Sequence, residues 1–193
     1  MVDERVSLPD TRPAPPPKES SGIRGAVEWV VILVGALIVA LVVKTFLLQA
    51  FYIPSGSMEP TLMIGDRVLV NKVSYDFHDV HRGDIVVFRT PPGEDNATIK
   101  DLIKRVIGLP GDTVEGHDGR VYIDGDPLKE PYLPAGTTTS AFPAEKIAPG
   151  RLWVMGDNRS NSKDSRYFHT ISTDLVVGRA FVKVWPLSQI GLL

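Results

Sequence analysis

The sequence predicts a mainly β domain, built as a barrel or as folded sheets, with one transmembrane helix preceding it. Three observations predict this arrangement. A continuous apolar run covers residues 29–43, short runs of β-branched and aromatic residues recur after residue 51, and Gly, Pro and Asp residues separate these short runs. Short strands divided by frequent turns are typical of barrels and folded sheets, and no segment after residue 53 shows a long helical period.

Composition excludes several classes of protein. The 193 residues include 21 Lys and Arg and 23 Asp and Glu, which gives a formal net charge of −2. A nucleic-acid-binding protein carries a basic patch or a basic domain, so this balance argues against nucleic acid as a partner. The chain has no cysteine, which excludes disulfides, thiolate nucleophiles and Cys-ligated metal sites.

The first segment, residues 1–24, is predicted to be a disordered, proline-rich tail. Residues 1–22 hold five of the 16 prolines and almost no large apolar side chains. Such a segment cannot bury enough apolar surface to offset the entropy lost on ordering. An alternative is that the tail is a proline-rich ligand for a partner domain.

Residues 25–50 are predicted to form a membrane anchor helix. The 20 residues from Trp29 to Leu48 reach about 30 Å as a helix, which is the thickness of a hydrocarbon core. Trp29 suits the aromatic belt at one interface. Lys44, about one turn from the other end, can extend its amine to the lipid headgroups.

Two other interpretations of this apolar segment are weaker. A cleavable signal peptide needs small residues before its cut site, whereas Leu48 would occupy the −3 position. A buried core helix of a soluble protein normally has a polar face, whereas this run is apolar on every face. The sequence therefore favours an anchor that spans the bilayer and stays attached.

The basic residues around the run predict its orientation. Lys44 is the only basic residue near the far end before Arg67, whereas four precede the run: Arg5, Arg12, Lys18 and Arg24. Positively charged flanks stay on the cytoplasmic side of a membrane. The N-terminal tail is therefore expected in the cytoplasm, and the β-rich domain, residues 51–193, on the extracytoplasmic face.

The β-rich domain is predicted from its short apolar runs and the turns between them. Turns are expected at Gly65, Gly83, Gly111 and Gly150, each beside an aspartate or a proline. Residues 126–150 carry five prolines and few apolar runs, so a long surface loop is expected there. The predicted strands cover residues 67–70, 84–88, 121–123, 151–155 and 178–185.

The segment IPSGSMEPTL, residues 53–62, is the first candidate for a chemical site. Its two prolines and one glycine predict an exposed bend that carries Ser55 and Ser57. The segment is not a nucleophile elbow, since the residue two before Ser57 is a serine where that motif has glycine. Taken alone, it is as well explained by an ordinary turn as by a nucleophile.

A serine nucleophile needs a base, and the sequence offers histidines and a lysine. A Ser57/His169/Asp164 triad is conceivable. His78 and His81 lie among aspartates, and as a metal pair they lack a clear third ligand.

Lys104 is the alternative base. As a strand, residues 99–107 place Lys104 beside Leu102 and Val106 on one face, with Arg105 on the other. Burial there would lower the pKa of the amine, and a neutral amine is a competent general base. The competing interpretation is that Lys104 and Arg105 are a solvated pair at a strand end.

The third candidate is the polar segment of residues 156–166, GDNRSNSKDSR. It directly follows a predicted strand and has no apolar side chain. Its short hydrogen-bonding groups and two arginines indicate a loop held by Asp–Arg pairs. An exposed polar turn is the alternative.

Taken together, these segments resemble the type I bacterial signal (leader) peptidases. The resemblance covers most of residues 27–190 and rests on four motifs after an N-terminal anchor. They are SGSMEPTL at residues 55–62, GDRVLVNK at 65–72, IKRVIGLPGD at 103–112 and GDNRSNSKDSR at 156–166. One such motif is weak evidence, whereas all four in this order are highly specific.

The resemblance implies a catalytic β-domain of the signal-peptidase type and a role for each matching residue. Ser57 matches the nucleophile, and Lys104 matches the general base of a Ser/Lys dyad. The oxyanion hole would use the backbone N–H of Ser57 and the hydroxyl of Ser55. Three further residues match positions that orient the lysine and support its loop, with Ser162 as the lysine-orienting hydroxyl and Asp164 and Arg166 as the supporting ion pair.

The resemblance also implies a substrate site and a set of partners. The partners would be signal-peptide-bearing preproteins and the phospholipid bilayer of a bacterial cell membrane, with no metal or cofactor. Ser160 departs from the pattern, since many members carry aspartate there, and we expect a small effect. The apolar wall for the small side chains of the substrate would comprise Ile53, Pro54, Met58, Leu62 and Ile103.

Two other functions remain to be separated from this one. Self-cleaving repressor proteases of the SOS response use a similar β-rich Ser/Lys domain, but a DNA-binding domain stands where this chain has its apolar run. A membrane-tethered β-domain that binds extracytoplasmic partners without catalysis is the other. It predicts that substitution of Ser57 and Lys104 leaves function in cells intact.

Overall fold

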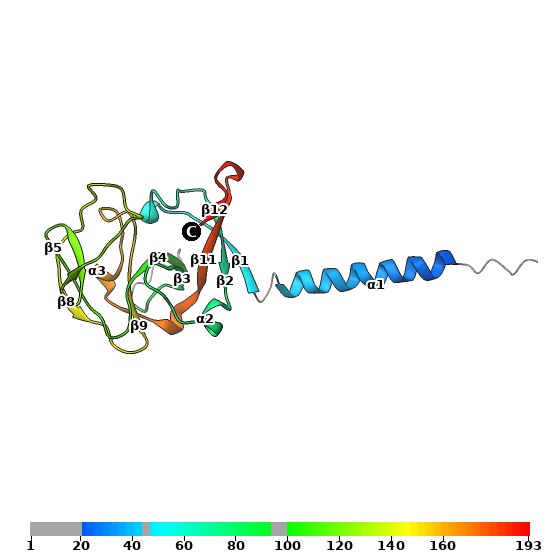
Figure 1. Cartoon of the computed structure of the whole chain (residues 1–193), viewed down its shortest axis with the longest axis horizontal. Helices are drawn as coiled ribbons and strands as arrows, with labels where there is room; N and C mark the ends of the chain where they lie inside the picture. Colours follow the sequence, from blue (N-terminus) through cyan, green and yellow to red (C-terminus); the bar gives the residue numbers. More distant parts are fainter. Residues whose placement is uncertain (1–20, 44–46, 94–99) are drawn as a thin grey trace, which may run out of the picture. The chain divides into compact units, whose positions relative to one another are not determined.

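The computed structural model describes residues 21–43, 47–93 and 100–193, and its parts are labelled in Figure 1. It comprises a long N-terminal helix and a β-rich unit, which are described separately below. Residues 1–20 of the predicted tail and Lys44 lie outside the described residues. The last four residues of the predicted tail, 21–24, are helical instead, because they continue the long N-terminal helix toward its start at Ser21.

Helix α1 covers Ser21–Val42. Its stretch Gly25–Val42 is long and apolar enough to cross a membrane, and none of that stretch is buried against the rest of the protein. Its 22 residues span about 33 Å, enough for a hydrocarbon core. A core helix of a soluble protein would be mostly buried, which this helix is not.

The predicted anchor of residues 25–50 extends too far as a helix. Helix α1 ends at Val42, and Leu48–Tyr52 form strand β1, which pairs antiparallel with β2 (Arg67–Asn71). The apolar run continues to residue 48, so composition alone does not mark the change. The backbone pairing of β1 with a strand 19 residues further on, from Leu48 to Arg67, decides it.

The larger sheet has eight strands, and all its pairings are antiparallel. Its order is β1-β2-β11-β3-β4-β9-β10, with β12 paired to β11. Strand β11 lies between β2 and β3, and the central strand β4 lies between β3 and β9. The remaining strands of this sheet are β3 (Ile85–Arg89), β4 (Asp101–Gly108), β9 (Arg151–Met155), β10 (Ile171–Ser172), β11 (Val176–Trp185) and β12 (Gly191–Leu192).

The smaller sheet corrects one expectation. Residues 126–150 are not one long surface loop, because strand β8 (Phe142–Lys146) pairs with β5 (Thr113–His117). Two more antiparallel strands complete the sheet, β6 (Arg120–Ile123) and β7 (Asp126–Pro127). Pro143 and Pro127 lie in strands at the two edges, where a missing N–H is tolerated.

In the described part of the β-rich unit, five short helical turns connect the strands, which agrees with the absence of a long helical period in this part of the sequence. Two have four residues, α2 (Ser74–Phe77) and α3 (Ser165–Phe168). Three are 3₁₀ turns, η2 (Gly56–Met58), η3 (Thr173–Leu175) and η4 (Leu187–Gln189). The turn η2 carries Ser57 and forms the predicted bend, but the bend is not exposed throughout as expected, because Ser57 and Met58 are buried in it.

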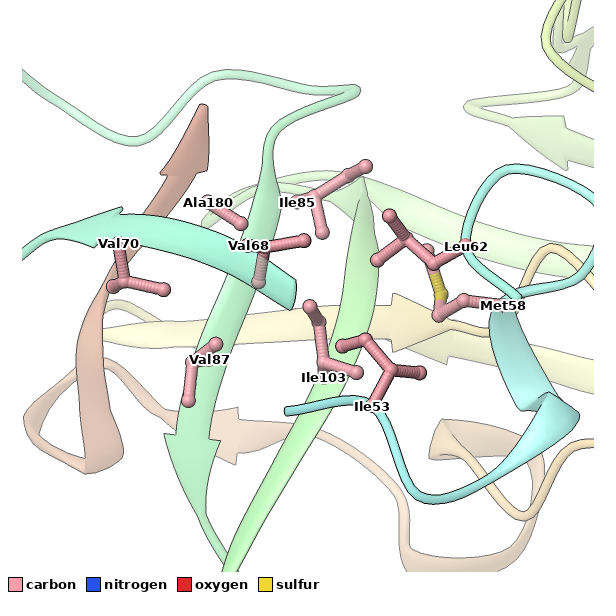
Figure 2. Packing of buried hydrophobic residues seen from close by; sticks show 9 residues of the cluster. All are labelled: Ile53, Met58, Leu62, Val68, Val70, Ile85, Val87, Ile103 and Ala180. Atoms are coloured by element: carbon pink, nitrogen blue, oxygen red, sulfur yellow. The ribbon is translucent and has the colours of Figure 1, made fainter. Parts of the chain in front are cut away.

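Three buried clusters hold the β-rich unit together, and the first one supports η2. Figure 2 shows Met58 and Leu62, just after Ser57, packed with Ile53, Ile85 and Ile103. Met58 and Leu62 have 0% of their surface exposed, so the chain on both sides of the nucleophile candidate is anchored by apolar packing. The second cluster includes Phe88, Val106 and Val154, and the third includes Ile107, Ile147 and Trp153.

Candidate active site

Ser57 and Lys104 are in contact, although 47 residues separate them in the sequence. The Nζ atom of Lys104 lies 2.7 Å from the Oγ atom of Ser57 and 3.0 Å from the carbonyl oxygen of Ile103. Strand β4 supplies the lysine and the turn η2 supplies the serine. The distance is that of a direct hydrogen bond, so a proton can pass between the two side chains without a bridging water.

Burial sets the charge of Lys104. The side chain is 3% exposed, and desolvation lowers the pKa of its amine from 10.5 to about 8, while Asp164 and Asp157 oppose the shift. Arg105 is 7% exposed, so the interpretation of Lys104 and Arg105 as a solvated pair is wrong. A substantial fraction of the amine is therefore neutral just above neutral pH, as a general base requires.

The turn η2 presents the backbone of Ser57 as well as its hydroxyl. An N–H in the first turn of a 3₁₀ helix has no partner within that turn, and this is the position of the Ser57 N–H. Ser55 precedes the turn with extended backbone, and its exposed side chain makes no capping hydrogen bond. The geometry leaves both groups available to a ligand, and the oxyanion-hole assignment stays a prediction.

The polar segment of residues 156–166, named here the catalytic loop, fixes the nucleophile turn from the other side. The backbone N–H of Asn158 donates to the carbonyl oxygen of Ser57 at 3.1 Å. The side-chain amide of Asn158 donates to the carbonyl oxygen of Gly56 at 2.9 Å. These contacts join two segments that lie about 100 residues apart in the sequence, as the 102-residue separation of Gly56 and Asn158 shows.

Gly156 is needed because the loop and the turn approach closely. A Cβ atom at this position would lie 2.4 Å from the carbonyl oxygen of Ser57 and 2.2 Å from the Oγ atom of Ser162. Real Cβ contacts do not reach such distances. The missing side chain is therefore what allows the catalytic loop to contact the backbone of Ser57.

Asp164 and Arg166 form the supporting pair that the sequence predicts. The Nε atom of Arg166 donates to Oδ1 of Asp164, and Nη2 donates to Oδ2, both at 2.8 Å. Asp164 is fully buried, and its Oδ2 also accepts from the N–H of Gly156 at 3.0 Å. The ion pair thus holds the start of the catalytic loop.

Ser162 lies in the catalytic loop beside Gly156, but its hydroxyl does not make the expected hydrogen bond to Lys104. Its hydroxyl oxygen is buried, and within the described part of the chain it has no hydrogen-bond partner. Its orienting role toward Lys104 therefore stays a prediction. Within the loop as a whole, burial of Asp157, Arg159, Ser162, Asp164 and Ser165 contradicts the alternative of an exposed polar turn.

A second ion pair in this region was missed by the sequence reasoning. Arg105 donates to Oδ1 of Asp157 through Nε at 2.9 Å and to Oδ2 through Nη2 at 2.6 Å. The hydroxyl of Thr61 donates to the same carboxylate at 2.5 Å. The alternation of strand β4 puts Lys104 and Arg105 on opposite faces, which is the signal that could have paired Arg105 with the second aspartate of the loop.

The smaller sheet contributes a third group of contacts. Glu130 accepts two hydrogen bonds from the buried guanidinium of Arg159, whose Nε donates to the carbonyl oxygen of Gly156 at 3.1 Å. Tyr132 donates to Glu130 at 2.7 Å, and the ring of Tyr132 lies 4.0 Å from the guanidinium carbon of Arg105. Burial, with Glu130 adding to it, raises the pKa of Tyr132, so its hydroxyl stays a donor.

Four of the five predicted substrate-binding residues are buried. Ile53, Met58, Leu62 and Ile103 belong to the first buried cluster, and only Pro54 is exposed. Ile103 has the largest exposed fraction of the buried four, at 9%. The four therefore form an apolar layer beneath the nucleophile turn, and their contact with substrate stays a prediction (Figure 2).

The structure separates the histidines from Ser57. His169 is exposed, and its Nδ1 atom lies 2.8 Å from Oε2 of Glu145, while Asp164 binds Arg166 instead. The structure thus does not assemble the Ser57/His169/Asp164 triad. His78 binds Ser74 and the carbonyl oxygen of Asp79. In the described ranges no group of three or more His, Asp or Glu side chains could hold a metal ion.

The chain is similar to known signal peptidases over most of its length. The model of the family "Signal peptidase, peptidase S26" matches residues 26–185. A probable signal peptidase I-2 of Synechocystis sp. is 44% identical, with 83% of this chain and 74% of that protein covered. A signal peptidase I of Leptolyngbya laminosa is 40% identical, with 95% and 92% covered.

A more distant relative gives the same result. A signal peptidase I of Mycobacterium tuberculosis is 35% identical over 92% of this chain and 78% of its own. A crystal structure of a signal peptidase I from Enterococcus faecalis is 32% identical, covers 53% of this chain and 97% of its own, and has a TM-score of 0.45.

The mainly β fold, the buried serine–lysine contact and these similarities define a serine protease, which is a hydrolase. The chain belongs to the signal peptidase family, peptidase S26. The family resemblance noted in the sequence is therefore confirmed, and enzymatic function is favoured over a purely binding domain. The apolar helix α1 is consistent with the membrane anchoring of this family.

Proposed function

We propose that Ser57 and Lys104 are the nucleophile and the general base with which this signal peptidase cleaves signal peptides from exported preproteins. The single observation that carries the assignment is the 2.7 Å contact between Nζ of Lys104 and Oγ of Ser57 in a buried site. The lowered pKa of the amine, about 8, supports it, because a fully charged lysine could not accept the serine proton.

The chemistry follows from this pair. The neutral amine of Lys104 accepts the proton of the Ser57 hydroxyl while Oγ attacks the carbonyl carbon of the scissile bond. The tetrahedral intermediate collapses to an acyl-enzyme ester, and the Lys104 ammonium gives its proton to the departing amine. A water molecule, deprotonated by the same amine, then attacks the ester and releases the signal peptide.

The Ser57 N–H and the Ser55 hydroxyl are proposed to stabilise the oxyanion of that intermediate. The Ser57 N–H lies in the first turn of η2, and the side chain of Ser55, the residue before that turn, makes no capping hydrogen bond. A donor at such a position contributes about 3–4 kcal/mol to lowering the barrier. Asn158, through its hydrogen bond to the carbonyl oxygen of Ser57, keeps the peptide plane of the turn fixed.

The residues before the scissile bond are proposed to bind as an added strand. The segment of β1 and the residues up to Ser55 form an edge of the larger sheet, since β1 pairs only with β2 among the described strands. An extended peptide can pair with such an edge through backbone hydrogen bonds. Shallow contacts with the apolar layer of Ile53, Met58, Leu62 and Ile103 would select small, Ala-like side chains at positions −1 and −3.

We further propose that the enzyme is a single-pass protein of the bacterial cell membrane. The N-terminus would lie in the cytoplasm and the β-rich domain on the extracytoplasmic face, as the basic residues before α1 favour. Because a signal peptide is itself inserted in the bilayer, tethering the site brings it close to the cut. In sequence, 15 residues separate Val42 at the end of α1 from Ser57.

The proposal predicts that Ser57→Ala abolishes cleavage. Full-length protein in detergent is incubated with a preprotein, and the released mature chain is measured by electrophoresis and mass spectrometry. Wild type is expected to cleave at one site and Ser57→Ala to fall to background. Ser188→Ala, in the exposed turn η4, serves as the matched control and should retain wild-type activity. Cleavage by Ser57→Ala at the wild-type rate would exclude Ser57 as the nucleophile.

The charge of Lys104 predicts the pH dependence of the reaction. Because the base acts in its neutral form, kcat/KM should rise about tenfold per pH unit at low pH and level off above the amine pKa of about 8. Initial rates at subsaturating preprotein concentration between pH 5.5 and 9.5 measure this midpoint. A profile that is flat from pH 6 to pH 9 would contradict a titrating lysine base.

A further inference from the structure

A cavity of about 440 Å³ lies beside the nucleophile turn, and the chemistry proposed above makes no use of it. Three segments form its walls. Glu59, Pro60 and Met63 follow the nucleophile directly, Asn158 and Ser160 come from the catalytic loop, and Pro134, Thr137 and Thr138 come from the chain between β7 and β8. The cavity therefore borders the attacking residue without including it.

The cavity and the apolar layer receive different side chains of the same turn. Met58 and Leu62 are fully buried in the apolar cluster, whereas Glu59 and Met63 line the cavity, and Met63 is 44% exposed. The residues of a substrate before the scissile bond are proposed to lie over the apolar layer. A peptide in extended conformation passes the nucleophile once, so the residues after the bond leave the region over the apolar layer, and the cavity borders the same turn without being lined by that layer.

Of the three charged side chains that line the cavity, two form ion pairs, and Glu59 forms none within the described part of the chain. The guanidinium of Arg159 is paired with Glu130, and the carboxylate of Asp157 is paired with Arg105. Glu59 is half-buried, and among the described residues none donates to its carboxylate. That carboxylate folds over Gly56, since a Cβ atom built on Gly56 would lie 2.9 Å from its Oε1. An uncompensated negative charge thus stands next to the nucleophile.

We propose that this cavity binds the first residues of the mature chain and that Glu59 selects among them by charge. A basic side chain at position +1 or +2 would gain the attraction of the carboxylate, and an acidic one would meet repulsion in a partly desolvated site. The new α-ammonium group of the product would benefit from the same carboxylate. This inference rests on the proposed function and assigns a specificity-determining role to a residue that takes no part in proton transfer.

The test compares two synthetic preproteins that differ only at position +2, with Lys in one and Glu in the other. Full-length wild type in detergent is expected to cleave the Lys substrate with a kcat/KM about fivefold higher at low salt. Glu59→Gln should bring the ratio to about 1, and Glu59→Lys should invert it. Glu115→Gln, on strand β5 away from the cavity, should keep the wild-type ratio.

Two further arms make the outcome decisive. The same Lys and Glu pair placed at position −4 should respond equally in wild type and Glu59→Gln, because that position lies on the other side of the nucleophile. In wild type alone, 0.5 M NaCl should reduce the ratio at +2, since salt screens a partly exposed charge. A wild-type ratio of 1, or a ratio that Glu59→Gln leaves unchanged, would overturn the assignment. Failure of wild type to cleave either substrate would instead refute the proposed function.

Discussion

Lys104→Met is expected to abolish cleavage and, at the same time, to raise the stability of the folded protein near neutral pH. The loss in kcat/KM should be at least ~10³-fold, because the substitution removes the proposed general base. Stability should increase because methionine fills a similar volume without an amine to desolvate, whereas folding now lowers the amine pKa from 10.5 to about 8.

The stability effect has a definite pH dependence. Folding lowers the pKa of Lys104, so the unfolded chain binds the proton more tightly than the folded chain does. Below pH 8 the amine is protonated in both states, and the full cost of burying its charge destabilises the fold. The gain from Lys104→Met should be on the order of 3 kcal/mol at pH 6 and should decline as the pH rises from 8 toward 10.5. Thermal unfolding of both proteins at pH 6, 8 and 10 measures it.

Two variants control for this prediction. Lys129→Met, at an exposed position, should change neither activity nor the pH dependence of stability. Lys104→Arg should be inactive, since a guanidinium keeps its proton and cannot act as a base. An active arginine variant, or a methionine variant that is less stable than wild type at pH 6, would refute the buried neutral amine.

Gly156→Ala is the second substitution with a large expected effect. The new methyl group would lie 2.4 Å from the carbonyl oxygen of Ser57, and a backbone oxygen cannot rotate away as a flexible side chain can. The catalytic loop and the nucleophile turn must therefore separate. A displacement of about 1 Å at the reacting groups costs about 10²-fold in rate, and the overpacking costs about 1–3 kcal/mol of stability.

Steady-state kinetics and chemical denaturation measure these two effects. The expected signature is a fall in kcat that exceeds the change in KM, because the methyl group displaces the Ser57 backbone, whereas the proposed substrate-binding residues Ile53, Met58, Leu62 and Ile103 belong to the first buried cluster. Gly191→Ala is the matched control, since a Cβ atom there would meet nothing within 4 Å. Wild-type kinetics in Gly156→Ala would show that the close approach is not required for catalysis.

The sequence predicted the elements whose signals are local. Strand β9 occupies the predicted residues 151–155, and β2 and β3 end within one residue of the predicted strands. The predicted turns at Gly65, Gly83, Gly111 and Gly150 all have positive φ, which glycine adopts without strain. Alternating side chains and turn residues are properties of a few neighbouring positions, and they can be read from the chain alone.

Other features depend on residues that are far apart, and these were missed. The extended conformation of residues 48–52 comes from their pairing with β2, which outweighs the apolar composition that favoured a helix. Glu130 gives no local signal, because a glutamate between prolines and leucines in an irregular segment is ordinary. Only the folded chain brings it to Arg159 and hence to Gly156.

The candidate site shows the same division. The resemblance of the four motifs to the signal peptidases selected Ser57 and Lys104 as partners, and the 2.7 Å contact agrees with that selection. No spacing could show that Asp157 pairs with Arg105, or that His169 pairs with Glu145, because each pairing depends on which faces of two distant elements meet. The sequence therefore predicted the contact between Ser57 and Lys104 better than the ion pairs that surround it.

The position of Lys104 on a central strand has a consequence for how this enzyme tolerates change. Strand β4 is held in register by Val86 on one neighbour and by Met155, opposite Arg105, on the other. If strand β4 slipped by one residue, Arg105, which keeps its proton, would replace the Lys104 amine beside Ser57. Insertions and deletions should therefore be tolerated in the flanking loops. A single insertion or deletion within one of the neighbouring strands β3, β4 and β9 should abolish activity.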